Sequence, residues 1–160
     1  MAKLLTAVTL AVTLALTACQ GQPSEGLDEP VTASRPAPEV RHDTEELAVT
    51  FPALDGPVSA SWIQWDNSGA EDAPRTKVVW IDAVVEVRPE TMETLVARNY
   101  PEDSGQVPAV QKVLEPELPP GPFLTGIELN MAFGGDRRST RVFLDPPSNA
   151  VVLQSYRIGS

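Results

Sequence analysis

Alternating apolar and polar residues mark the clearest predicted strand, which spans residues 77–87. One face of this strand is apolar throughout and carries Val79, Ile81, Ala83, Val85 and Val87. Asp82 and Glu86 fall on the opposite face. A period of two with one apolar face predicts a strand in a sheet that is covered on one side.

Shorter patterns predict four further strands. Residues 58–65, 141–144 and 150–158 are rich in apolar side chains and are bounded by turn-forming residues. Residues 47–54 are the weakest candidate, because Pro52 cannot donate a ladder hydrogen bond and would confine this strand to an edge of the sheet.

Three helices are predicted between these strands. The first spans residues 89–99 and begins with proline, which suits the first helical turn. A shorter helix is expected at 108–114. Thr125 and Glu128 have the spacing of a capping box, so a third helix should start there and end at Gly134.

The order of the predicted elements is strands, then helices, then strands, which indicates an α+β fold. We expect one small domain over residues 47–160. It should contain an antiparallel sheet with two or three short helices on one face.

The first 18 residues have a different pattern. One positive side chain, Lys3, precedes an uncharged apolar stretch from Leu4 to Ala18. A helix that crosses a membrane needs about 20 apolar residues. The shorter stretch therefore predicts an export signal that is removed from the mature protein.

The signal ends in Leu16-Thr17-Ala18-Cys19, which resembles the lipobox of bacterial lipoproteins at all four positions. The resemblance covers the signal region only. It implies cleavage between Ala18 and Cys19, a diacylglyceryl group on the Cys19 thiol, and a place in the cell envelope facing away from the cytoplasm. Because Gln20 is not aspartate, it implies the outer membrane if the cell has one. An ordinary secretory signal with a chance cysteine is the alternative.

Residues 19–46 are rich in proline, glycine and acidic residues. Such a segment cannot bury enough apolar surface to fold, so we expect a lipid-bearing cysteine followed by a disordered tether. The tether would hold the domain off the membrane to which the lipid on Cys19 binds; a recognition segment is the alternative. His42, the only histidine, lies in this tether and is expected to be solvated and not catalytic.

The charge and the motifs of the chain limit the functions that it can have. The chain without its signal has 11 basic and 22 acidic residues, which argues against nucleic acid as a partner. Cys19 is the only cysteine, so its acylation would leave no disulfide and no thiol chemistry. Asp82 and Glu86 lie roughly 13 Å apart along one strand, too far for a glycosidase pair. The sequence predicts neither a cofactor nor a metal site.

Two features could bind a partner. Arg137, Arg138 and Arg141 form a basic cluster in an otherwise acidic region; a solvated loop is the alternative. At least two of the three tryptophans are expected in the core, and Trp65, beside a polar loop, is the best candidate for an exposed anchor.

These observations favour an envelope lipoprotein whose domain is a non-catalytic module that binds an envelope protein or a cell-wall component. Two alternatives remain open at this point. One is a hydrolase that uses only carboxylates, and the other is a carrier of a small apolar ligand in a pocket between sheet and helices.

Overall fold

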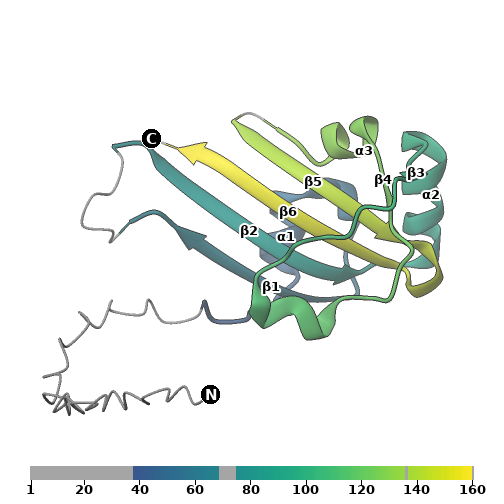
Figure 1. Cartoon of the computed structure of the whole chain (residues 1–160), viewed down its shortest axis with the longest axis horizontal. Helices are drawn as coiled ribbons and strands as arrows, with labels where there is room; N and C mark the ends of the chain where they lie inside the picture. The colour runs from purple at the N-terminus through teal and green to yellow at the C-terminus, as the bar shows by residue number, and fades with distance from the viewer. Residues whose placement is uncertain (1–37, 69–74, 136, 160) are drawn as a thin grey trace, which may run out of the picture. The chain divides into compact units, whose positions relative to one another are not determined.

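Six strands form one antiparallel sheet in the order β1-β2-β6-β5-β4-β3 (Figure 1). The computed structural model of the chain describes residues 38–68, 75–135 and 137–159. The strands are β1 Ser59–Asp66, β2 Lys77–Glu86, β3 Glu102–Asp103, β4 Leu124–Thr125, β5 Arg138–Asp145 and β6 Ala150–Gly159. The sheet and the short helices beside it confirm the predicted α+β fold.

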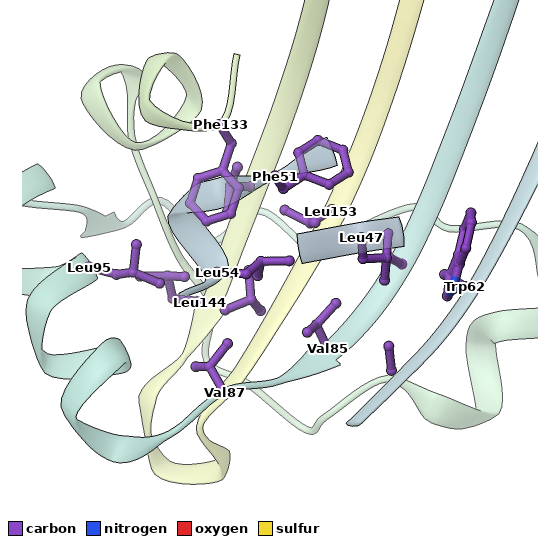
Figure 2. Packing of buried hydrophobic residues seen from close by; sticks show 14 of the residues in the cluster. Leu47, Phe51, Leu54, Trp62, Val85, Val87, Leu95, Phe133, Leu144 and Leu153 are labelled. Atoms are coloured by element: carbon purple, nitrogen blue, oxygen red, sulfur yellow. The ribbon is translucent and has the colours of Figure 1, made fainter. Parts of the chain in front are cut away.

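Three α-helices and one 3-10 helix pack on the first face of the sheet. They are α1 Glu45–Thr50, η1 Pro52–Leu54, α2 Pro89–Asn99 and α3 Ile127–Ala132. Their apolar side chains meet those of the central strands in the larger core cluster. Figure 2 shows Leu47 and Leu54 in this layer, together with Val85 of β2 and Leu153 of β6. The predicted helices at 89–99 and 125–134 therefore lie on one face as expected, as α2 and α3, and α1 joins them there.

The predicted strand at 47–54 is wrong, because this segment forms α1 and η1. Leu47, Phe51 and Leu54 are spaced four and three residues apart and are each at most 1% exposed. That spacing places all three on one side of a helix. Pro52 is accommodated at the first position of η1, where its missing N–H removes no helical hydrogen bond.

The second face of the sheet is crossed by residues 107–123, which we call the covering segment (Figure 1). It contains the 3-10 helix η2 Lys112–Glu117 in place of the helix predicted at 108–114. Three of its buried side chains, Val110, Leu114 and Phe123, pack in a second core cluster with Ile63 and Phe143. The sheet was expected to be covered on one face only. This expectation is wrong at the centre of the sheet, where both faces are covered.

The capping box predicted at the start of the third helix does not form. Thr125 lies in β4, and its hydroxyl donates to the carbonyl oxygen of Val142 at 2.7 Å. Gly126 occupies the N-cap position of α3 and has no side chain to cap with. The Thr125 hydroxyl is therefore bonded to β5 and does not cap the helix.

The domain begins before the predicted boundary at residue 47. Arg41 exchanges two main-chain hydrogen bonds with Trp62 of β1, at 2.7 and 2.9 Å. The described part of the predicted tether, residues 38–46, therefore belongs to the fold. The signal residues and Cys19 lie outside the described residues, and within the described ones no helix could span a membrane.

Candidate functional site

The predicted arginine cluster is divided between the two faces of the sheet. Arg138 and Arg141 belong to β5 and not to a loop, so strand alternation sends their side chains to opposite faces. Arg141 is exposed on the second face, whereas Arg138 lies half-buried on the first. Arg137 precedes the strand and is exposed. The three side chains therefore do not form the single patch that the sequence suggested.

Trp65 lies in a group of apolar side chains on the second face. Cross-strand pairing places Trp65 opposite Trp80, and Trp80 opposite Tyr156. The rings of Trp65 and Trp80 stack with centroids 6.0 Å apart and an interplanar angle of 14°. One step further along the same face, Val78 is paired with Ile158. We call these five residues the aromatic patch.

The aromatic patch lies beyond the covering segment. Gln154 of β6 marks the limit of that cover, since its amide donates to the carbonyl oxygen of Ala109 at 2.7 Å. Tyr156, two residues further on, is 44% exposed, and Ile158 is 46% exposed. In Figure 1, strands β1, β2 and β6 continue past the covering segment towards the C-terminus. This end of the sheet presents apolar side chains to solvent.

The tryptophans depart in part from the expectation. Trp62 is fully buried, and its indole Nε1 donates to the carbonyl oxygen of Asp43 at 2.9 Å. Trp65 and Trp80 are both half-buried. The sequence places Trp65 and Trp80 on two neighbouring strands but does not reveal Tyr156 beside them, because that contact depends on the register between β2 and the distant strand β6.

His42 is exposed, as expected, but it belongs to the domain and not to a tether. Its Nδ1 lies 3.0 Å from the carbonyl oxygen of Ala60 and 3.3 Å from the hydroxyl of Ser61. A carbonyl oxygen only accepts hydrogen bonds, so Nδ1 must carry the proton in this contact. The same nitrogen cannot then accept the proton of Ser61, and the pair lacks the geometry of a nucleophile and its base.

A cavity of about 680 Å³ lies beside His42 and is lined in part by Glu45, Glu86 and Glu117. None of the polar side chains that line it is itself buried. Catalytic groups are held in productive geometry by packing and by supporting hydrogen bonds. The lining therefore supports neither a carboxylate-based hydrolase nor an apolar carrier.

Asp82 is a buried carboxylate with a structural partner. It is 6% exposed on the second face, and its Oδ2 accepts a hydrogen bond from the main-chain N–H of Gln111 at 2.8 Å. Burial raises the pKa of Asp82, and the hydrogen bond from Gln111 opposes that rise. Asp82 thus fastens the covering segment, while Glu86 is exposed at the strand end.

We expect Asp82→Asn to increase the free energy of unfolding at pH 7 by about 1 kcal/mol, because the neutral amide keeps an acceptor for Gln111 without burying a charge. The pKa of Asp82 is higher in the folded than in the unfolded chain. Protonated Asp82 therefore adds to the free energy of unfolding, and this contribution is fully present below the unfolded pKa. It is lost as the pH rises through the folded pKa.

The gain from Asp82→Asn should therefore be larger at pH 7 than at pH 4, as measured by urea unfolding at both pH values. Glu86→Gln is the matched control, since it removes an exposed carboxylate from the same strand face. A variant that is destabilised equally at both pH values would contradict the raised pKa of Asp82.

No group of three histidine, aspartate or glutamate side chains in the described part of the chain is arranged to hold a metal ion. Comparison with protein-family models, curated proteins and solved structures finds no match. The aromatic patch and the arginines are therefore the surface features that point to a function.

Proposed function

We propose that this chain is a bacterial envelope lipoprotein, anchored by lipid on Cys19, whose domain is a non-catalytic binding module. The lipobox Leu16-Thr17-Ala18-Cys19 supports the anchor. The aromatic patch supports the binding role, because apolar side chains are typical of an interaction site where, as here, no described residue covers them fully. Trp65, one of the predicted partner-binding residues, belongs to it.

The partner that best suits this surface is a glycan strand of the cell wall. Trp65, Trp80 and Tyr156 form a row across three neighbouring strands, which spans roughly 10 Å at about 4.8 Å per strand. Aromatic side chains offer apolar surface on which sugar rings can stack. Arg141 is exposed on the same face and can donate hydrogen bonds to sugar hydroxyls.

The size of the patch also favours a linear polymer over a folded protein. A stable protein interface buries about 800 Å² on each partner and involves 20 or more residues per side. The aromatic patch has five residues, and the chain as a whole is acidic. An extended, uncharged glycan can use such a short row without meeting strong repulsion.

Co-sedimentation of the mature chain with insoluble cell-wall polysaccharide tests this proposal. We expect Trp80→Ala and Tyr156→Ala each to weaken binding about 10- to 30-fold, as for central aromatic anchors. Tyr100→Asn is the control, because Tyr100 is 80% exposed away from the patch and asparagine tolerates its positive φ of 45°.

Three outcomes would count against the glycan. One is wild-type protein that stays in the supernatant with every wall preparation. Another is Trp80→Ala that sediments as the wild type does. The third is binding that disappears when the wall preparation is treated with protease, which would assign the patch to an envelope protein instead.

A further inference from the structure

Two arginines lie side by side on the first face of the sheet, opposite the aromatic patch. Arg138 of β5 is the direct cross-strand partner of Arg157 of β6. Residues paired in this way have Cβ atoms about 4.5–5.5 Å apart, and like charges at such positions repel each other. The pair is therefore destabilising unless an anion or an acidic group lies close to it.

Arg138 is held in place by residues that do not neutralise it. Its guanidinium lies 4.8 Å from the centre of the Phe51 ring and donates to the carbonyl oxygen of Thr50 at 3.4 Å. Burial, and then the positive charge of Arg157, lower the pKa of Arg138. The side chain is thus packed in position with its charge partly desolvated.

Neither arginine has an acidic partner among the described residues. The ion pairs there involve Arg41, Lys77 and Arg88, and none includes Arg138 or Arg157. The chain has 22 acidic residues against 12 basic ones, so a pair of arginines without a carboxylate is unexpected.

Arg138 and Arg157 both line a cavity of about 270 Å³. Gln64 and Ser155 supply further polar groups to its wall. Glu46 also lines the cavity, but its Oε2 already accepts a hydrogen bond from Arg41 at 2.6 Å. A cavity of this volume is below the range of about 300–1,000 Å³ that holds drug-sized ligands, so a small ligand group fits it better.

We propose that this cavity is a binding site for a phosphate group, held between the guanidinium groups of Arg138 and Arg157. Arginine presents its donors in a planar fork that matches phosphate oxygens two at a time. Two arginines also balance the charge of close to −2 that a phosphate monoester carries near pH 7. The site lies on the opposite face from the aromatic patch and does not depend on the proposed function.

Titration of the mature chain with inorganic phosphate, followed through the ¹⁵N signals of the arginine side chains, tests the site. We expect saturable shifts of the Arg138 and Arg157 signals, and glycerol 3-phosphate should produce the same shifts if the natural ligand is a phosphate monoester. Arg157→Gln should weaken phosphate binding at least 10-fold. Arg157 is exposed, so its replacement should leave the backbone amide spectrum dispersed.

Arg98→Gln is the matched control, because it removes an exposed arginine from α2 and should leave phosphate binding unchanged. Shifts that do not saturate, or that persist unchanged in Arg157→Gln, would overturn the site. Acetate at the same ionic strength tests the specificity for phosphate. If acetate binds as tightly as phosphate, the assignment to phosphate is wrong.

Discussion

Replacing Trp62 with alanine should lower the free energy of unfolding by about 3–5 kcal/mol, as large-to-small substitutions of buried aromatic residues do. Trp62 is fully buried in the larger core cluster (Figure 2). The guanidinium of Arg41 lies 3.8 Å from the centre of its ring. Its indole N–H also donates to Asp43, so the substitution removes contacts that join β1 to the start of the domain.

Urea unfolding and amide hydrogen exchange would measure this effect. Trp62→Phe keeps an aromatic ring but leaves the carbonyl of Asp43 without its donor, so we expect a smaller loss of about 1–2 kcal/mol. Val49→Ala, which truncates a side chain that is 82% exposed on α1, is the control. If Trp62→Ala loses no more stability than Val49→Ala, the core does not depend on this residue.

Cys19→Ser should abolish association of the protein with the membrane. The proposed thioether forms on sulfur, and two or more acyl chains on one residue are needed for stable anchoring. When cells are fractionated, we expect the variant in the soluble envelope fraction and the wild type in the membrane fraction. Mass spectrometry of the wild type should find a chain that starts at Cys19 and carries lipid.

Gln20→Ala provides the control, because it changes the neighbouring residue without removing the thiol. A wild-type protein that retains Met1 and carries no lipid would contradict the anchor. The domain of Cys19→Ser should still bind wall polysaccharide, so failure of the anchor and failure of the aromatic patch are separable results.

Periodicity alone predicts the strands and the helix that have one apolar and one more polar face. Residues 58–65, 77–87 and 150–158 correspond to β1, β2 and β6, and residues 89–99 correspond to α2. The segment at 47–54 is a helix and a 3-10 turn instead of the predicted strand, which Pro52 already made the weakest candidate. The spacing of its buried residues is helical, and proline at the start of a 3-10 turn is compatible with it.

The candidate sites were harder to predict, because they depend on contacts between residues that are distant in sequence. Trp80 meets Tyr156, and Arg138 meets Arg157, only through the register of β6 with β2 and β5. The composition of residues 19–46 also gives no sign of where the domain begins. The proline-rich segment ends in residues that hydrogen-bond to β1 through the main chain of Arg41, and no side-chain pattern reveals such a contact.

The pairing of Arg41 with Trp62 has a further consequence at high surface density. It occupies the outward main-chain hydrogen bonds at the middle of β1, and at the opposite edge β3 and β4 have two residues each. Among the described strands, neither edge offers a long free ladder to another molecule. A lipid anchor would confine copies to one plane, where neighbours collide often. Edges that do not pair would keep these crowded copies separate and leave each one free to bind its own ligand.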